Sequence, residues 1–424
     1  MERYNEYKDS GVQWLGEIPS HWEVKRIASY FIERRTKVSD KDYEPLSVTK
    51  NGIFPQLENV AKTNDGDNRK LVLKDDFVIN SRSDRKGSSG VSKYDGSVSL
   101  INIVLNPRSN VIPDYCNYIL KGYSFIEEYY RNGRGIVADL WTTRYDEMKT
   151  IKICMPPVIE QQAIVSYLDT ATAKIDEAIA QQQKMIDLLN ERKQIIINNA
   201  VTKGLNPDVP MKDSGVDWIG EIPEHWEVNK LKNCAKTNSG STPRNIAGKE
   251  NPTSTIRWVR TTDLHNNVVE DTSEYISEKE MSSASCPWLP VNTVLISMYG
   301  GAGSFGKVGL LNIEATINQA LCSINCNSSI LPVFMFYYLQ SVHRIWMKYA
   351  ASSRKDPNLN QEIIRNLDLV IPPLVEQEQI VASIESKLSS LETVVKCSEK
   401  QISLLQERKQ IIINDVVTGK VKVS

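Results

Sequence analysis

Two long segments of the chain carry apolar residues at intervals of seven. Each opens with Pro-Pro, at 156 and at 372, and then runs for about 45 residues without glycine or proline, in a composition rich in good helix formers. The heptad positions of the first segment are Leu168, Ile175, Gln182, Leu189 and Ile196, interleaved with Thr172, Ile179, Ile186, Lys193 and Ala200. Those of the second segment are Ile384, Leu391, Ser398, Leu405 and Ile412, interleaved with Leu388, Val395, Ile402, Lys409 and Val416. The pattern predicts two helices, each on the order of 67 Å long, that bury their seams as an antiparallel coiled-coil pair.

Polar residues interrupt both seams at equivalent places. Gln182 corresponds to Ser398, and Lys193 corresponds to Lys409. Polar seam residues can set the register of a coiled coil while lowering its stability. Solvated ends of a loosely packed helix would give the same pattern, and the sequence leaves both interpretations open.

The helical segments belong to a frame that occurs twice in the chain. KDSGVQWLGEIPSHWEV at 8–24 returns as KDSGVDWIGEIPEHWEV at 212–228, with fourteen of seventeen positions identical. PPVIEQQAIVSYL at 156–168 returns as PPLVEQEQIVASI at 372–384, and NERKQIIINNAV at 190–201 returns as QERKQIIINDVV at 406–417. Each helical segment ends near a glycine, Gly204 or Gly419, which is a common stop signal. Such self-similarity predicts an internal pseudo-two-fold repeat.

The first block of the frame carries two tryptophans and a histidine in both copies. Trp14, His21 and Trp22 correspond to Trp218, His225 and Trp226. An aromatic plug that packs the chain onto the helices is favoured over a chemical role for the histidines, because nothing around them matches between the copies. Residues 25–155 and 229–371, which lie between the blocks, show no obvious similarity to each other. A fixed frame with two divergent inserts is what a protein needs to present two recognition surfaces on one scaffold.

Composition narrows the class of protein. Apolar residues make up 41% and charged residues 24% of the 424 residues, which is typical of a globular protein. No apolar run approaches the length of a membrane span, the N-terminus is charged, and the seven cysteines are odd in number and scattered, so we expect a cytoplasmic protein without disulfides. Cys322 and Cys326 could form half of a metal site, but the alternation of a strand explains their spacing, and we expect no metal. The net charge of −1 requires that any DNA-binding groups be local or that a partner help.

Motifs for catalysis are incomplete. GAGSFGK at 301–307 has the glycine and lysine spacing of a phosphate loop, but Val308 stands where Ser or Thr would hold magnesium, and the following residues are typical of a strand rather than a helix. The Asn-Pro pairs continue as NPR, NPD and NPT, and the Asp-Pro pair at Asp356 continues to Asn358, so the aromatic active-site motif of a base methyltransferase is missing. We therefore expect a non-catalytic chain that holds no cofactor.

The order of SGVxWxGEIPxHWEV, a variable segment, PPxxEQxxIV and a long helix ending in ERKQIIIN, all present twice, resembles the specificity subunits of Type I restriction-modification systems over essentially the whole chain. The resemblance implies that each variable insert is a target-recognition domain for half of an interrupted DNA site, and that the helices separate these domains and dock methyltransferase subunits. It also implies a complex with two modification subunits, to which two restriction subunits can be added. S-adenosylmethionine, ATP and Mg would belong to those partners.

Candidate DNA contacts are the basic, hydroxyl and amide side chains of the inserts, because phosphates and base edges are bound by these groups. FVINSRSDRKGSSG at 77–90 and VLISMYGGAGSFGK at 294–307 both run from a strand into a loop rich in Gly and Ser, which predicts a shared fold for the two inserts. The candidates of the first insert are Arg82, Arg85, Lys86, Ser88, Ser89, Arg131, Arg134, Thr143 and Arg144, with Arg69 and Lys70 further upstream. Those of the second are Arg257, Arg260, Tyr299, Ser304, Lys307, Arg354, Lys355, Asn358 and Asn360. Any single one of them could equally be a solvated surface residue.

We expect an α+β protein with two mixed α/β target-recognition domains separated by two long antiparallel helices. The predicted divisions are 1–155 for the first domain with its repeat block, 156–203 for the first helix, 204–371 for a linker, the second block and the second domain, and 372–424 for the second helix and tail. The predicted function is recognition of a two-part DNA site. The alternatives are a coiled-coil adaptor that binds proteins and a nucleotide-binding enzyme that uses Gly301 to Lys307.

Overall fold

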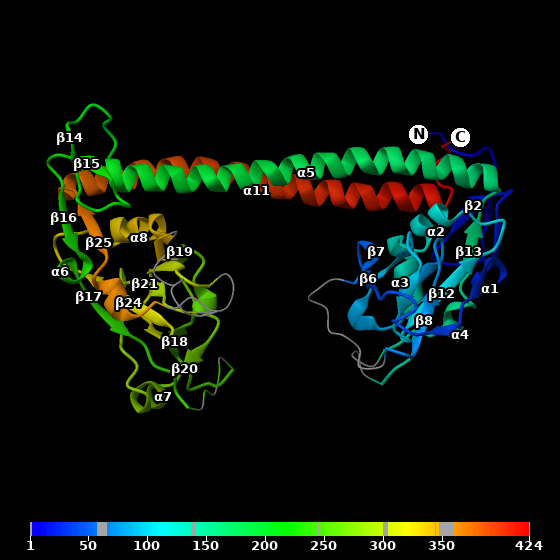
Figure 1. The fold of residues 1–424 in the computed structure, drawn as a ribbon, viewed down its shortest axis with the longest axis horizontal. Coiled ribbons are helices and arrows are strands. Elements are labelled where there is room, and N and C mark those ends of the chain that lie inside the picture. Colours follow the sequence, from blue (N-terminus) through cyan, green and yellow to red (C-terminus); the bar gives the residue numbers. More distant parts are fainter. Residues whose placement is uncertain are drawn as a thin grey trace. The chain divides into compact units, whose positions relative to one another are not determined.

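The computed structural model describes residues 2–423 except 57–65, 137–140, 245, 247, 249, 300–303, 344 and 347–358. The chain forms two compact units, which we call unit 1 (Met1–Gln183 with Glu399–Ser424) and unit 2 (Lys184–Ser398). The two predicted long helices are present as α5 (Val158–Lys203) and α11 (Leu374–Val417), and each begins directly after its Pro-Pro pair (Figure 1). Each unit therefore contains a globular domain and a part of both helices.

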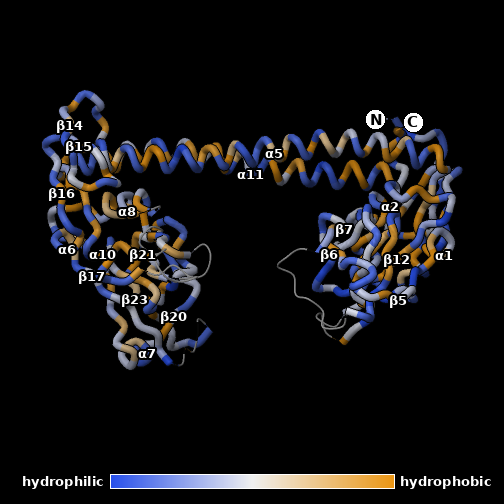
Figure 2. The backbone as a smooth tube through the Cα atoms, in the orientation of Figure 1, coloured by the Kyte–Doolittle hydropathy of each residue, from blue (hydrophilic) through white to orange (hydrophobic). Residues whose placement is uncertain are grey.

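The two helices pair in an antiparallel sense within each unit. In unit 1 the Nζ atom of Lys409 on α11 lies 2.6 Å from an Oδ1 of Asp176 on α5, and in unit 2 the Nζ atom of Lys193 on α5 lies 2.9 Å from an Oε1 of Glu392 on α11. All twenty predicted seam residues are buried or half-buried, whereas most of the residues between them are exposed. Apolar positions accordingly alternate with polar ones along both helices (Figure 2). The coiled-coil prediction is confirmed, and the seam lysines form ion pairs between the helices instead of lying at loosely packed ends.

The domain of unit 1 is built around a four-stranded antiparallel sheet in the order β10-β9-β12-β4, beside a three-stranded sheet in the order β11-β8-β5. The remaining strands pair as β1 with β2, β3 with β13, and β6 with β7. The elements before α5 are β1 (Tyr7–Asp9), β2 (Glu17–Pro19), β3 (Glu23–Arg26), α1 (Ile27–Tyr30), β4 (Phe31–Glu33), β5 (Lys37–Val38), β6 (Leu46–Thr49), β7 (Gly52–Pro55), β8 (Arg69–Val72), β9 (Phe77–Asn80), the 3-10 turn η1 (Ser83–Arg85), β10 (Ser89–Val91), β11 (Gly96–Val98), β12 (Asn102–Pro107), α2 (Pro113–Ile119), α3 (Tyr123–Arg131), α4 (Tyr145–Met148) and β13 (Lys152–Met155).

The domain of unit 2 repeats the main sheet of unit 1. Its strands β17, β24, β21 and β22 take the order that β4, β12, β9 and β10 take in unit 1, with β19 added in parallel beside β22. The elements are β14 (Met211–Asp213), β15 (Glu221–Pro223), β16 (Glu227–Lys230), α6 (Leu231–Cys234), β17 (Ala235–Ser239), β18 (Ile256–Val259), η3 (Thr261–Asp263), β19 (Asn267–Val269), β20 (Tyr275–Ile276), α7 (Glu278–Ser283), β21 (Val294–Ser297), β22 (Val308–Leu311), β23 (Thr316–Ile317), β24 (Leu321–Cys326), α8 (Pro332–Ser341), α10 (Gln361–Arg365) and β25 (Asp368–Ile371). The inserts thus share a topology although their sequences differ, as the matching strand-and-loop pattern predicted.

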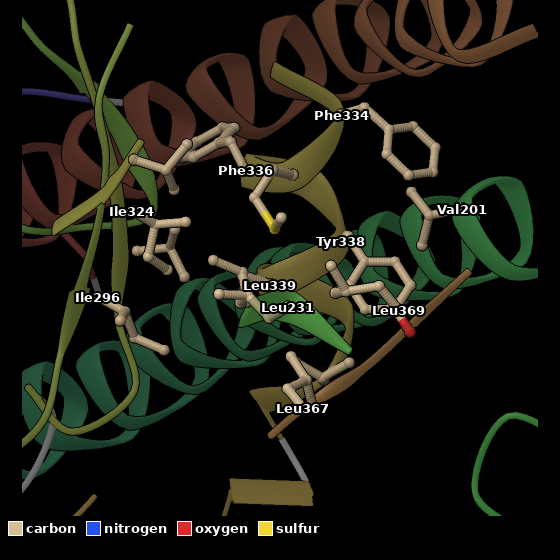
Figure 3. Close-up of a cluster of buried hydrophobic side chains, with 14 of the residues drawn as sticks. Val201, Leu231, Ile296, Ile324, Phe334, Phe336, Tyr338, Leu339, Leu367 and Leu369 are labelled. Carbon is tan, nitrogen blue, oxygen red and sulfur yellow. The ribbon is translucent and has the colours of Figure 1, made fainter. Parts of the chain in front are cut away.

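Each domain core is completed by the end of a long helix. In unit 2, Val201 of α5 lies among the buried side chains of the domain, near Leu369 of β25 (Figure 3). In unit 1, Val416 and Val417 of α11 join the domain core in the same way. Gly204 and Gly419, which follow the helix ends, have φ angles of 74° and 75°, a left-handed conformation that favours glycine. A Cβ atom at Gly419 would also lie only 2.3 Å from the Cδ atom of Pro19, so this stop is required by packing as well as by φ.

The two repeated blocks bind each other through the Glu of the PPxxEQ motif. In unit 1 the indole Nε1 of the fully buried Trp22 donates to Glu160 Oε2 over 3.0 Å, and His21 Nε2 lies 2.6 Å from Glu160 Oε1. In unit 2, Trp226 and His225 form the same contacts with Glu376, at 2.8 and 2.6 Å. The predicted aromatic plug is confirmed, and the histidines take part in it by orienting this carboxylate.

The Gln of the same motif joins the helix start to the segment before α2 or α8. Gln161 is fully buried, accepts from the backbone N–H of Ile112 over 2.8 Å, and donates to the carbonyl of Pro156. Gln377 accepts from Leu331 N over 2.8 Å and donates to the carbonyl of Pro372. The frame is repeated in sequence because the same set of buried hydrogen bonds is formed twice.

Candidate nucleic-acid interface

Two candidate segments of the first domain, about 60 residues apart in sequence, lie side by side. Arg82, which follows β9, forms an antiparallel bridge with Thr142, and Thr142 pairs in turn with Arg134. The backbone N–H of Thr143 donates to the carbonyl of Ser81 over 2.9 Å. The loop after β9 and the segment before α4 therefore form one surface, although the sequence showed them as separate basic groups.

Tyr130 of α3 binds the backbone of the loop after β9 through its hydroxyl group. Its hydroxyl contacts the carbonyl oxygens of Asn80 and Arg82, each over 3.2 Å, and its ring is buried. Burial raises the pKa of Tyr130 to about 12, so the hydroxyl remains a donor near neutral pH. The hydrogen bonds of Tyr130 and the contacts with Thr142 and Thr143 thus fix the backbone of this loop.

The candidates on this loop divide into exposed and buried groups. Arg82 is half-exposed beside Asp84, with 3.3 Å between Nε and Oδ1, and Arg85 is exposed. Lys86 forms an ion pair with Glu127 at 2.7 Å and lies over the ring of Tyr130. The side chains of Ser88 and Ser89 are buried at the start of β10, so they face the interior of the domain.

The candidates before α4 divide in the same way. Arg131 is paired with Glu128, and the largely exposed Arg134 lies 3.3 Å from Glu147. Arg144 is exposed at the start of α4. The hydroxyl of the fully buried Thr143 donates to the carbonyl of Tyr129 over 3.0 Å, which is a structural contact inside the domain.

A polar groove of about 290 Å³ lies between the hairpin strand β6 and the ends of β9 and β12. It is lined by Pro45, Leu46, Ser47, Val48, Thr49, Gln56, Arg69, Asn80, Arg82, Asp84, Arg85, Ser99, Ile101 and Asn102. Hydroxyl, amide and guanidinium groups of this kind hydrogen-bond to base edges and phosphates. Three arginines against one aspartate also give the groove a positive charge, although the net charge of the whole chain is −1.

The groove includes residues that the sequence did not single out. Asn80 and Asn102 are directly opposite each other on β9 and β12, and Ser47 and Thr49 come from β6, more than 30 residues upstream. Only Asn80, at the end of the apolar run FVI, carried a sequence signal, because a polar residue that ends a buried strand is favoured at a sheet edge. Arg69 is mostly buried, with its Nε donating to Ser97 Oγ over 2.8 Å, so its guanidinium supports the wall of the groove.

In the second domain the corresponding segments meet at the corresponding place. The backbone N–H of Leu359 donates to the carbonyl of Met298 over 2.7 Å, as Thr143 does to Ser81 in the first domain. Tyr299, which follows Met298 in the chain, is half-buried, as are Ser304 and Lys307. Arg354, Lys355 and Asn358 lie outside the described residues.

The other candidates of the second domain are engaged in local contacts. Asn360 is exposed at the start of α10, and its side chain accepts from the N–H of Ile363 over 2.8 Å as a helix cap. Arg257 lies 3.4 Å from Asp271, and Arg260 lies 3.4 Å from Glu274. These exposed or half-buried pairs are weak, so they can be exchanged for contacts with another anion.

The phosphate-loop hypothesis is opposed by the segment after GAGSFGK. Val308–Leu311 is strand β22, whose backbone pairs with β21 and β19, so no helix N-terminus follows the loop as phosphate binding would require. Cys322 and Cys326 lie on strand β24, as their alternation predicted. Within the described ranges, no group of three or more His, Cys, Asp or Glu side chains is placed to hold a metal ion. A search of the same ranges finds no helix with an apolar stretch long enough to cross a membrane.

Comparison with known proteins gives a consistent result. Residues 223–401 match the family model of the Type I restriction modification DNA specificity domain. The putative type I restriction enzyme MjaX specificity subunit of Methanocaldococcus jannaschii is 22% identical over 437 residues, which cover 96% of each protein. The EcoKI specificity subunit of Escherichia coli K12 is 22% identical over 433 residues, covering 95% of this chain and 90% of that protein.

A solved structure shares the fold over nearly the whole chain. It comes from work on complex assembly and conformational transition of the type I R-M system, and it superposes with a TM-score of 0.69 and 15% sequence identity, covering 95% of this chain and 99% of that one. The domain match and the full-length relatives agree with the duplicated frame and its two recognition domains. Over nearly its whole length the chain is similar to specificity subunits of Type I restriction-modification systems, and residues 223–401 match the DNA specificity domain of that family, whose general role is recognition of DNA sequence.

Proposed function

We propose that this chain recognises an interrupted DNA target in two parts, with one half-site bound by each domain. The observation that carries the proposal is that both domains have the same main sheet and the same frame contacts, while the side chains at their strand-end loops differ completely. Equivalent positions hold Ser81 and Met298, followed by Arg82 and Tyr299. Two similar scaffolds with different polar surfaces are suited to two different base sequences.

The proposed assembly contains two modification subunits for each copy of this chain, and two restriction subunits in the complete enzyme. Methyl transfer and cleavage are assigned to those subunits, together with S-adenosylmethionine, ATP and Mg. This chain contributes the choice of site and no chemistry. Support comes from its incomplete catalytic motifs and from its similarity to specificity subunits over nearly the whole chain.

The direct test is an electrophoretic mobility-shift assay on the purified complex with its modification subunits, combined with methylation mapping in a host that expresses the complex. We expect binding and methylation at one interrupted sequence. Binding without any sequence preference would exclude the proposal and favour the protein-binding adaptor.

Exchange of one insert tests the assignment of half-sites to domains. If residues 25–155 are replaced by the insert of a relative, one half-site should change and the other should remain, because β3, β13 and the frame contacts of Trp22 are formed at the borders of the insert. The control is the same exchange of residues 229–371. A change in both half-sites after a single exchange, in a folded complex, would contradict independent recognition.

A further inference from the structure

We propose that Arg82 and Asp84 of the first domain together read one G·C base pair, and that the neighbouring Arg85 binds a phosphate. This inference rests on the proposed function and deepens it, because it names the base pair and the residues that determine specificity. It is carried by the groove at the end of β9 and β12, by the fixed backbone of Arg82, and by the pairing of its side chain.

The backbone of Arg82 is held on both sides. Its N–H donates to Asn80 Oδ1 over 3.0 Å, and its carbonyl accepts from Tyr130 over 3.2 Å and from the N–H of Arg85. The bridge to Thr142 adds a contact from another segment. Because this backbone is already ordered, binding through Arg82 requires no ordering of the loop, and the starting point of the side chain is fixed as specific recognition requires.

The side chains of Arg82 and Asp84 are paired loosely. Each side chain is 46% exposed, and 3.3 Å separate Arg82 Nε from Asp84 Oδ1. Exposed ion pairs of this kind contribute little to stability. Both groups line the groove, so each can exchange its partner for a ligand without opening the domain. The pair thus presents a fork of donors and an acceptor side by side.

This arrangement matches the major-groove edge of one base pair in particular. Guanine offers O6 and N7 as acceptors, which an arginine binds with two hydrogen bonds, and the N4 amino group of the paired cytosine is a donor that an aspartate accepts. An A·T pair offers the donor N6 between two acceptors, so the same two side chains cannot satisfy it as well. The attraction between Arg82 and Asp84 keeps donor and acceptor close enough to bind the two bases of a single pair.

The neighbouring cations differ from Arg82 in their surroundings. The exposed Arg85 also lines the groove, and no ion pair of its side chain is found in the described part of the chain, so it is suited to a phosphate. Lys86 is held by Glu127 and by the ring of Tyr130, away from this role. Substituting Arg82 or Arg85 by alanine therefore gives two matched variants, because each removes one positive charge from the same loop.

The experiment measures binding of the complex with its modification subunits to a set of duplexes in which each base pair of the first half-site is varied in turn. Arg82→Ala should abolish the preference for G·C at one position, a loss of discrimination of about 5- to 150-fold, and leave the other positions unchanged. Asp84→Ala should weaken the preference at the same position. Arg85→Ala should weaken binding to all sequences alike and reduce the magnitude of the negative slope of log K against log salt by about one.

Thermal unfolding of each variant complex serves as the check on folding. Arg82→Lys keeps the positive charge but not the two parallel donors of the guanidinium group, so it should lose the preference for G·C while retaining most of the affinity. The inference is overturned if Arg82→Ala lowers binding to every sequence equally, if Asp84→Ala acts at a different position, or if the first half-site contains no G·C pair. A wild-type complex that shows no sequence preference would instead overturn the proposed function itself.

Discussion

Inserting four residues into both long helices, after Gln182 in α5 and after Ser398 in α11, should move the two half-sites apart. Four helical residues add about 6 Å, and a base pair rises about 3.4 Å, so we expect a spacer that is longer by one or two base pairs. The two insertion points coincide to within one residue with the places where the chain passes between unit 1 and unit 2, so the contacts inside each unit are kept. The ion pairs of Lys409 with Asp176 and of Lys193 with Glu392 also remain within their own units.

Insertion of two residues at the same points is the matched control. Four residues advance a helix by about 400°, which rotates the seam by only about 40°, whereas two residues rotate it by about 200°. The seam side chains beyond a two-residue insertion would then face solvent, and each buried Leu or Ile contributes on the order of 1.5–3 kcal/mol. Two-residue variants should therefore assemble poorly, although they add less length.

Methylation mapping reads the spacer directly, and the unfolding temperature of the complex shows whether each variant is intact. A four-residue variant that forms a stable complex and methylates the original spacer would refute the reasoning. The partner subunits, and not the helices, would then set the distance between half-sites.

Three further predictions concern the frame, the first domain and catalysis. In chemical denaturation, Glu160→Ala should lower the free energy of unfolding by about 1–3 kcal/mol, because the buried indole N–H of Trp22 loses its acceptor. The control Glu399→Ala, at an exposed position, should change it by less than about 0.5 kcal/mol. Equal effects of the two substitutions would contradict the contact between Glu160 and Trp22. By the same measurement, Arg34→Ala should lower the free energy of unfolding by about 3–5 kcal/mol, because the Asp76 carboxylate, only 1% exposed, loses a bidentate ion pair. The control Lys37→Ala, at an exposed position, should lower it little. A small effect of Arg34→Ala would show that other groups satisfy the Asp76 carboxylate. The purified chain alone should neither methylate nor cleave DNA in assays with S-adenosylmethionine, or with ATP and Mg, and methyl transfer without partners would contradict the assignment of chemistry to other subunits.

The duplicated frame could be predicted from sequence because its signals are local and occur twice. Every residue that the heptad spacing placed in the seam is buried or half-buried, since a helix repeats its faces within a few residues whatever else surrounds it. The recurrence of WxGEIPxHW and PPxxEQ indicated a packing device, and the structure shows why both motifs are needed, because Glu160 and Glu376 bind the Trp and His of the other motif.

The composition of the candidate interface was decided by tertiary structure. Ser88, Ser89 and Thr143 have the chemistry of DNA-binding residues, but they are buried, and Asn360 caps a helix. Whether a serine near a strand end faces solvent depends on what covers that face of the sheet, and this is not encoded in the serine's neighbours along the chain.

The groove depends on pairings between distant segments. Arg82 meets Thr142 across about 60 residues, and Asn80 lies opposite Asn102 because β9 and β12 pair in that register. Strand pairing of this kind is set by burial of whole sheet faces, so a local pattern can show that a strand exists without showing its partner. The sequence by itself therefore determined the frame, the presence of two inserts and the resemblance to the specificity subunits, while the set of side chains that surround one groove was determined only when the sheets folded together.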